Sequence, residues 1–287
     1  MKRVICFAGL TFSLICGSLL LAPRTSAITY GFVDSNNTFP NTGAFIVKSS
    51  STGQIFPICS GTLITPNVFL TASHCTVFYT QELAPEGYVA YVSLDPSIPF
   101  GDLTSNKTQL LSVAHVVSNP NYNQSQSDSG DIAVLILDRN VRGVTPATLP
   151  ACGLLDQVVA QNGLKTAVFT NAGYGVQNRV VSGGVPFFQD LNPVPRMFSF
   201  SSFNSLNGGY LRLSQNPSTG NGGTCFGDSG GPNFLTLNGQ QLIVSITITG
   251  DSVCRSTNVV YRLDTISAQG FLAYVNAAFG TSIPISC

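Results

Sequence analysis

Short apolar segments alternate with turn-forming residues along most of the chain. The segments are mostly four to eight residues long and rich in Val, Ile, Thr, Phe and Tyr, while Gly, Pro, Asn and Ser cluster between them. This pattern is typical of β-strands joined by tight turns. It predicts an all-β fold of antiparallel barrels or sandwiches. The predicted strands cover residues 44–47, 68–71, 89–94, 110–117, 132–137, 167–170 and 242–249.

One helix and two loops complete the predicted pattern. Residues 266–279 favour a helix near the C-terminus, with Thr265 and Ser267 as alternative N-caps. The stretches 201–209 and 216–223 are rich in Gly, Ser and Asn, so we expect loops there. The chain contains no internal repeats.

The N-terminus has the features of a secretory signal peptide, which we place at residues 1–27. Lys2 and Arg3 precede an apolar run over residues 4–22, and small residues stand at Thr25 and Ala27. A signal peptidase recognises this arrangement. An uncleaved membrane anchor is the alternative, because the run approaches the ~20 residues that span a bilayer. We expect cleavage after Ala27, which predicts a secreted, extracellular chain with no membrane attachment.

The composition excludes several classes of protein. Apolar residues make up 44% of the chain and charged residues 9%, and Lys plus Arg balance Asp plus Glu at 13 each. This balance provides no basic surface for nucleic acid, so no nucleic-acid partner is expected. A high apolar content with no net charge also argues against disorder. The 287 residues suffice for one large domain or two smaller ones.

Cysteine usage agrees with export. Six cysteines lie beyond the predicted signal peptide, and an even number in an oxidising compartment suggests three disulfides. Zinc is the alternative, but the chain has no Cys-x-x-Cys pair and its two histidines are far apart in sequence. We therefore expect neither a metal nor another cofactor. The six cysteines are Cys59, Cys75, Cys152, Cys225, Cys254 and Cys287.

Three short motifs carry candidate catalytic chemistry. Residues 227–232 read Gly-Asp-Ser-Gly-Gly-Pro, and the glycines around Ser229 allow a tight turn with converging N–H groups. A serine hydroxyl becomes a nucleophile when a base takes its proton and N–H donors bind the oxyanion. His74 directly precedes Cys75, and Asp131 leads into an apolar strand where a carboxylate needs a hydrogen-bond donor. Taken singly, the motifs also fit a turn, a structural histidine and an aspartate facing water.

The motifs occur in the order His, Asp, Ser, and each resembles a motif of the chymotrypsin/trypsin-like (S1) serine proteases. Residues 28–31 resemble the activated N-terminus of that family, and residues 59–64 resemble the run that precedes its catalytic histidine. The resemblance covers essentially the whole mature chain. It implies two antiparallel six-stranded β-barrels with a C-terminal α-helix. The N-terminal barrel is expected at 28–150 with His74 and Asp131, and the C-terminal barrel at 151–287 with Ser229.

The same resemblance implies a role for each residue of the site. Ser229 is the nucleophile, His74 is the general base and later the acid, and Asp131 orients His74. The N–H groups of Gly227 and Ser229 form the oxyanion hole. Asp128 is the alternative aspartate, but a Gly- and Ser-containing loop surrounds it. The expected function is that of a secreted serine endopeptidase, which cleaves proteins or peptides through an acyl-enzyme intermediate and acts as a monomer. The second histidine, His115, is expected to be structural.

Further features of the family carry over to the cysteines and to the substrate pocket. The resemblance implies the disulfides Cys59–Cys75, Cys225–Cys254 and Cys152–Cys287. Gly223 occupies the base position, where trypsin-like members carry an aspartate that binds a substrate Lys or Arg. The side chains of Thr247 and Val259 at the pocket walls then favour a small or medium apolar P1 residue, which is the residue on the acyl side of the cleaved bond. The residues expected in the pocket are Gly223, Thr224, Ser245, Thr247 and Val259, and Ser245 is also expected to hydrogen-bond the catalytic aspartate.

The resemblance also implies a mode of activation. Cleavage before Ile28 creates an α-ammonium that pairs with Asp228 and shapes the oxyanion hole, whereas cleavage after Arg24 with later trimming is the alternative route. Two other functions stay open, namely a catalytically silent homologue that binds a partner and an exported adhesion domain. Glycosylation sequons, which matter only in a host that glycosylates, begin at Asn36, Asn106 and Asn123.

Overall fold

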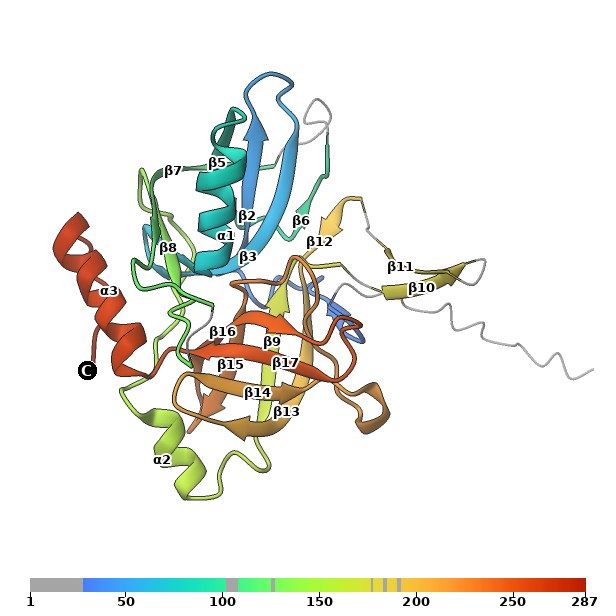
Figure 1. The fold of residues 1–287 in the computed structure, drawn as a ribbon, viewed down its shortest axis with the longest axis vertical. Coiled ribbons are helices and arrows are strands. Elements are labelled where there is room, and N and C mark those ends of the chain that lie inside the picture. The colour runs from blue at the N-terminus through green and yellow to red at the C-terminus, as the bar shows by residue number, and fades with distance from the viewer. Residues whose placement is uncertain (1–27, 102–107, 125–126, 177, 183–184, 190–191) are drawn as a thin grey trace, which may run out of the picture.

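Two closed antiparallel β-barrels make up most of the structure (Figure 1). The computed structural model describes residues 28–287 except 102–107, 125–126, 177, 183–184 and 190–191, with only the backbone described over 178–189. The predicted signal peptide and Asn106 therefore lie outside the described residues. The all-β prediction of two six-stranded barrels with a C-terminal helix is confirmed. No helix in the described part of the chain is long and apolar enough to span a membrane.

The first barrel closes in the order β2-β3-β4-β8-β7-β5. All residues of β4 and β8 are buried, whereas β7 has only two buried residues among its eight. Each large apolar side chain so buried contributes about 1.5–3 kcal/mol. Two short helical segments, α1 (Ser73–Phe78) and η1 (Tyr79–Leu83), follow β4. The strands are β2 (Thr42–Ser49), β3 (Ile55–Thr65), β4 (Val68–Thr71), β5 (Tyr88–Ser93), β7 (Leu111–Ser118) and β8 (Ala133–Leu137).

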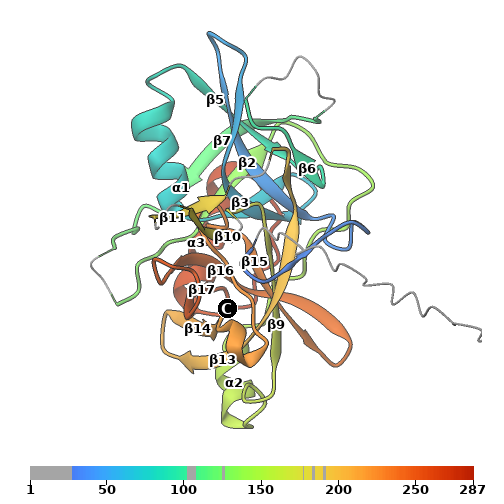
Figure 2. The same ribbon diagram turned by 90° about the vertical axis from the view of Figure 1, so that its right-hand side faces the viewer.

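The second barrel has the order β13-β14-β17-β16-β15-β9, and pairing of β9 with β13 closes it. β1 (Phe32–Val33) joins its edge by pairing with β13, so the N-terminal segment lies on the second barrel. Figure 2 shows both barrels from the side, with α2 (Leu154–Ala160) at the end of the second. The strands are β9 (Val168–Gly173), β13 (Met197–Leu206), β14 (Tyr210–Ser214), β15 (Pro232–Leu237), β16 (Gln240–Gly250) and β17 (Thr257–Arg262).

Short elements connect and decorate the barrels. β6 (Ser97–Ile98) pairs with β12 (Val194–Pro195), and β10 (Asn178–Ser182) pairs with β11 (Val185–Gln189) in a hairpin. A 3-10 turn, η2 (Pro217–Thr219), lies in the loop expected over 216–223. The loop expected over 201–209 is wrong for residues 201–206, because β13 continues to Leu206 and pairs there with β14, whereas residues 207–209 do connect the two strands. Pairing on both edges of β13 overrides the low strand preference of its Ser and Asn residues.

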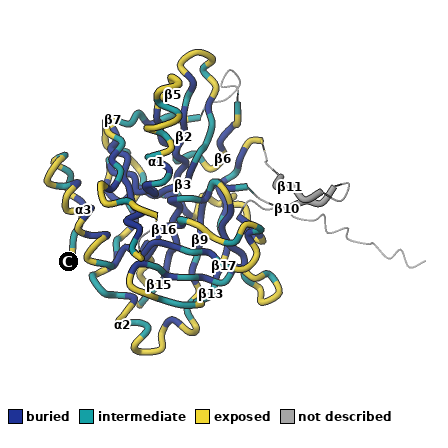
Figure 3. Tube along the Cα trace, in the orientation of Figure 1, coloured by how far each residue is buried: buried dark blue, intermediate teal, exposed yellow. Residues whose placement is uncertain are grey.

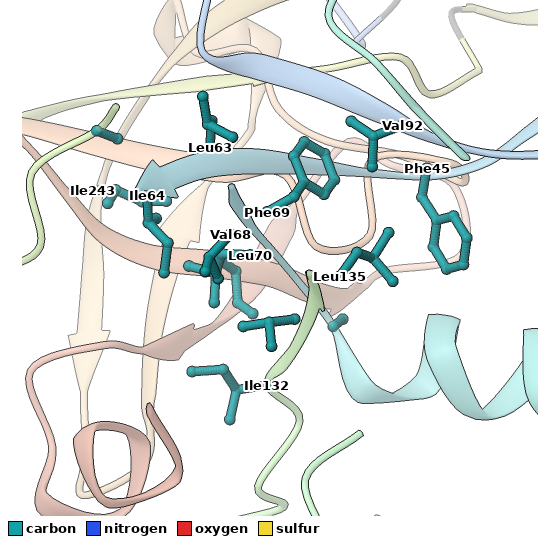
Figure 4. Packing of buried hydrophobic residues seen from close by; sticks show 14 of the residues in the cluster. Phe45, Leu63, Ile64, Val68, Phe69, Leu70, Val92, Ile132, Leu135 and Ile243 are labelled. Atoms are coloured by element: carbon teal, nitrogen blue, oxygen red, sulfur yellow. The ribbon is translucent and has the colours of Figure 1, made fainter. Parts of the chain in front are cut away.

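One apolar cluster continues from the first barrel into the second. Figure 4 shows Ile64 of β3 beside Ile243 of β16, together with Phe69 and Leu135 from the interior of the first barrel. Buried positions follow the strands of both barrels, whereas exposed positions gather in loops and on the outer helices (Figure 3). The two barrels thus share an apolar core where they meet.

The C-terminal helix α3 (Ile266–Phe279) confirms the predicted helix at the same residues. Of the two candidate caps, Thr265 is the N-cap, and its hydroxyl accepts a hydrogen bond from the Ala268 N–H at 3.1 Å. The helix packs on the first barrel, since the Phe279 ring lies 5.1 Å from the His115 ring of β7 (Figure 1). His115 is exposed and contacts this helix, and its predicted structural role stays a prediction. The predicted division of the chain at residue 150 stays a prediction.

Candidate active site

His74 is held from both sides of its short helix. It is the second residue of α1, and a disulfide joins the next residue, Cys75, to Cys59 on β3. The preceding residue, Ser73, donates its hydroxyl to the carbonyl oxygen of Ile132 at 2.7 Å. These anchors place the imidazole at the start of β8. Disulfides also join Cys152 to Cys287 and Cys225 to Cys254, as the resemblance implied.

The Asp131 carboxylate binds His74 through both of its oxygens. Oδ2 lies 2.8 Å from Nδ1 of the imidazole, and Oδ1 accepts the backbone N–H of His74 at 2.9 Å. The Asp131 side chain is 7% exposed and that of His74 is 26% exposed. The carboxylate thus fixes the ring orientation and leaves Nε2 as the second nitrogen available for proton transfer.

Ser229 lies on a loop that contacts the first barrel. Its carbonyl oxygen accepts the Ser60 N–H at 2.9 Å and lies 3.9 Å from Sγ of Cys75, the neighbour of His74. Gly230 has φ of +77°, and a Cβ there would overlap Thr71 Oγ1 and backbone of β3, so only glycine fits. Within the described residues, no hydrogen bond joins the Ser229 hydroxyl to the His74 ring. Such bonds are often long without substrate.

Two N–H groups beside Ser229 are free to bind an anion. Gly227 has φ of +93°, a conformation that favours glycine, and it turns the chain two residues before Ser229. In the described part of the chain, the N–H groups of Gly227 and Ser229 have no acceptor, whereas Gly230 N–H donates to the Thr247 carbonyl at 2.7 Å. The unpaired donors are those that the resemblance assigns to the oxyanion hole.

Asp228 is fully buried beneath this loop. Its Oδ1 accepts the Gly175 N–H at 2.8 Å, and its Oδ2 accepts the Cys225 N–H at 2.9 Å. Burial raises the pKa of Asp228 to about 7, despite these two hydrogen bonds. No hydrogen bond or ion pair among the described residues joins Asp228 to Ile28. Ile28 is buried, and Thr29 forms a bridge with Gly223, so this segment reaches the region beside the Cys225–Cys254 disulfide.

A cavity of about 250 Å³ opens beside Ser229. Thr224 and Thr247 line it, as expected, but Gly223 and Val259 do not. Gly223 packs against Gln215, because a Cβ on Gly223 would overlap the buried side chain of that residue. The residues that line the cavity are Thr224, Cys225, Phe226, Ser229, Thr247, Ile248, Thr249, Gly250, Asp251, Ser252 and Cys254.

The structure does not support the expected hydrogen bond between Ser245 and the catalytic aspartate. The Ser245 hydroxyl is buried without a hydrogen-bond partner, and β-pairing sets Ser245 opposite Asn233 and Arg262 inside the second barrel. Thr247, two residues later, makes the backbone bonds to the Gly230–Gly231 segment. The cavity wall thus begins two residues beyond Ser245.

The remaining candidates have other partners. Asp128 accepts the Tyr261 hydroxyl at 2.7 Å and makes no described contact with His74, which favours Asp131 as the partner of the imidazole. Cys59, His74 and Cys75 cluster as metal ligands do, but the two sulfurs form a disulfide and offer no thiolate. The sequence did not indicate Ser60 or Gln215, whose roles depend on contacts between distant segments.

Comparison with known proteins agrees with this geometry. The family model described as Trypsin matches residues 31–268. Vitamin K-dependent protein C of Equus caballus is 31% identical over 157 residues, which cover 52% of this chain and 94% of the relative. The Felis catus protein of that name is 29% identical, with the same shares covered, and the Mus musculus protein is 27% identical over 70% of this chain and 42% of its own. The chain therefore belongs to the trypsin family of serine peptidases.

Proposed function

We propose that the protein is a secreted serine endopeptidase that uses Ser229, His74 and Asp131 as its catalytic triad. The observation that carries this proposal is the two-point contact of Asp131 with His74, at 2.8 and 2.9 Å, beside the loop of Ser229. A purely structural histidine would not require, next to its neighbour Cys75, a serine loop with unpaired N–H groups at Gly227 and Ser229. This combination favours an enzyme over a silent homologue or an adhesion domain.

The mechanism uses the described groups in sequence. His74 takes the proton of the Ser229 hydroxyl while the oxygen attacks the substrate carbonyl carbon. The negative charge that develops on the carbonyl oxygen is bound by the N–H groups of Gly227 and Ser229. His74 then gives its proton to the leaving amine, and water hydrolyses the acyl-enzyme by the same steps. Asp131 holds the imidazole orientation and stabilises its cationic form throughout.

We infer that the cavity beside Ser229 accepts a small or medium apolar P1 side chain. The β-branched residues Thr247 and Thr249 narrow its wall. Asp251 also lines it, but four donors surround its carboxylate, namely the Gln215 amide at 3.1 Å and the N–H groups of residues 255–257 at 2.8–3.0 Å. Although burial opposes ionisation, these bonds lower the pKa of Asp251. Three of the four donors bind Oδ1 and one binds Oδ2, so we infer that this carboxylate holds its own loop and does not bind a substrate cation.

A P1-varied peptide library tests this preference. We expect Ala and Val to be cleaved faster than Lys and Arg, because an unpaired cation in the cavity loses hydration without a compensating partner. Asp251→Asn should leave that ranking unchanged. A dominant Lys or Arg preference that disappears in Asp251→Asn contradicts the inference and assigns Asp251 to substrate binding.

Activation and location complete the proposal. Cleavage before Ile28 supplies an α-ammonium that can pair with the buried Asp228 carboxylate. Among the described residues, two backbone N–H groups bind this carboxylate and no cation pairs with it. Proteins or peptides outside the cell are the proposed substrates, and the enzyme is proposed to act as a monomer. N-terminal sequencing of the active, secreted protein tests the cleavage site, since full activity in a form that begins well before Ile28 rules out this activation.

Labelling with a serine-directed organophosphonate tests the triad directly. We expect stoichiometric labelling at Ser229, with loss of labelling in Ser229→Ala and in His74→Ala. Ser252 lines the same cavity and provides the matched control, since Ser252→Ala should still be labelled. An unlabelled wild-type protein, purified with its disulfides intact, favours the silent homologue instead.

A further inference from the structure

Arg196 is a fully buried arginine whose guanidinium binds segments from both barrels. It lies between β12 and β13. Its Nε donates to Asp34 Oδ2 at 2.8 Å, and its Nη2 donates to Asn37 Oδ1, so it binds the N-terminal segment. Its Nη1 donates to the carbonyl oxygens of Thr42 and Leu94, both at 3.1 Å, at the ends of two strands of the first barrel. A buried arginine so fully bonded fixes these segments relative to one another.

Asp34 is bound as firmly as its partner. Burial opposes its ionisation, but the N–H groups of Thr38 and Phe39 and the Arg196 guanidinium together lower the pKa of Asp34. The carboxylate is therefore ionised at neutral pH and needs the Arg196 cation. Loss of that cation leaves a buried charge unpaired, which disturbs the whole junction.

Tyr174 connects this junction to the catalytic loop. Its hydroxyl accepts a hydrogen bond from Arg196 Nη1 at 3.3 Å and donates to the Asp95 carbonyl at 2.7 Å. Its backbone N–H donates to Ser60 Oγ at 2.9 Å, and that hydroxyl donates to the Gly227 carbonyl at 2.9 Å. Three hydrogen bonds thus lead from the guanidinium to Gly227, whose N–H is one of the two proposed oxyanion donors.

The two glycines beside Tyr174, Gly173 and Gly175, pack directly against Asp228. Gly175 donates its N–H to Asp228 Oδ1 at 2.8 Å, and a Cβ on either Gly173 or Gly175 would overlap the Asp228 carboxylate. Close packing transmits small displacements instead of absorbing them. A shift of the Tyr174 backbone must therefore move Asp228, and with it the Gly227–Ser229 turn.

We propose that Arg196 is a positioning residue for the oxyanion hole, acting through the Tyr174 hydroxyl to hold the Gly173–Gly175 backbone against Asp228 and Gly227. The inference rests on the proposed function, because it takes the Gly227 N–H as an oxyanion donor. The role concerns the transition state more than substrate binding. Misplaced oxyanion donors stabilise the transition state less, while they affect substrate binding little. We therefore expect kcat to fall while KM changes little.

Three substitutions test this role in the mature, disulfide-bonded enzyme. Arg196→Met removes the cation at similar size, Tyr174→Phe removes only the connecting hydroxyl, and Arg196→Lys keeps the charge. Removal of one oxyanion donor elsewhere lowers kcat by about 100- to 1,000-fold, so we expect about 100-fold for Arg196→Met and about tenfold for Tyr174→Phe. KM for a peptide substrate should change less than about threefold, and Arg196→Lys should recover part of the loss.

Arg262 provides the matched control for the loss of a buried ion pair. It is 2% exposed and binds Asp156 and Asp264 at 2.8 and 2.9 Å, away from the oxyanion loop. Arg262→Met should lower the melting temperature as Arg196→Met does, yet leave kcat per labelled active site near wild type. If Arg196→Met does not fold, Tyr174→Phe decides the question against the same control.

The outcomes separate this inference from the proposed function. A wild-type protein that resists the organophosphonate overturns the proposed function itself. A labelled wild type in which Tyr174→Phe and Arg196→Met keep wild-type kcat, or lose kcat no more than Arg262→Met, overturns only the positioning role. Selective loss of kcat in the first two variants, with partial recovery in Arg196→Lys, supports it.

Discussion

The pH dependence of stability should reverse when the bond before Ile28 is cleaved. In a chain that retains Ala27, burial raises the pKa of Asp228 from 3.8 to about 7. The folded chain therefore binds a proton there that the unfolded chain releases between those values. Stability is unaffected below pH 3.8 and declines as the pH rises to 7. This difference in pKa between the unfolded and folded chain corresponds to a loss of about 4 kcal/mol of stability, which is complete above neutral pH.

The mature form should behave in the opposite way. An α-ammonium at Ile28 that pairs with Asp228 lowers the pKa of the carboxyl and raises that of the amine. The stabilisation by the pair is then present at neutral pH and is lost as alkaline pH removes the ammonium proton. Breaking one side of such a buried pair costs about 3–5 kcal/mol. The two forms should thus differ most near pH 8.

Urea denaturation from pH 5 to 9 measures this difference. Both forms carry Ser229→Ala to prevent self-digestion, and one begins at Ile28 while the other retains Ala27. Asp228→Asn should flatten the dependence in the form that retains Ala27 and should destabilise the form that begins at Ile28 at neutral pH. The control Asp138→Asn, at an exposed position, should leave both profiles unchanged. Parallel pH profiles for the two forms would refute the pairing of Ile28 with Asp228.

Two further predictions concern the triad and the C-terminal helix. Ser229→Ala and His74→Ala should each remove nearly all peptidase activity, and the double variant should lose little more, because the members of a triad act as a unit. If Ser229→Ala, free of contaminating protease, keeps a tenth of the wild-type turnover, the assignment of Ser229 is contradicted. Thr265→Ala removes the N-cap and should lower the unfolding free energy by about 1 kcal/mol in urea denaturation, while Ser267→Ala should cost less. Equal losses in both variants contradict the assignment of Thr265 as the cap.

Strong local patterns in the sequence predicted the helix and most strands. Residues 132–137 form an unbroken apolar run, and β8 occupies Ala133–Leu137 with every residue buried. The helix α3 begins and ends where its apolar spacing and cap indicated. The segment 201–206 resembles a loop in sequence, because its Ser and Asn residues favour turns. It forms a strand because it pairs with the neighbouring strands β9 and β14.

The substrate pocket depends on register, which a sequence pattern specifies weakly here. Along β16, Ile243 to Thr249 are almost all β-branched or small, so a displacement by two or three residues leaves a similar pattern. The register follows from backbone bonds between Thr247 and the Gly230–Gly231 segment. These bonds bring Thr247–Ser252 to the cavity and leave Ser245 in the barrel interior. No local signal in the sequence distinguishes these two registers.

The catalytic geometry finally depends on one strand of the first barrel. His74 and Asp131 belong to the first barrel and Ser229 to the second, so their separation depends on the contacts between barrels. Ser60 of β3 makes three of these contacts, since its N–H holds Ser229, and its hydroxyl donates to Gly227 and accepts from Tyr174. The disulfide from the adjacent Cys59 to Cys75 ties the same strand to the histidine. The proposed nucleophile, base and oxyanion donors thus all contact a single two-residue stretch, Cys59–Ser60, and the proposed effect of Arg196 enters this stretch through the hydrogen bond between Tyr174 and Ser60.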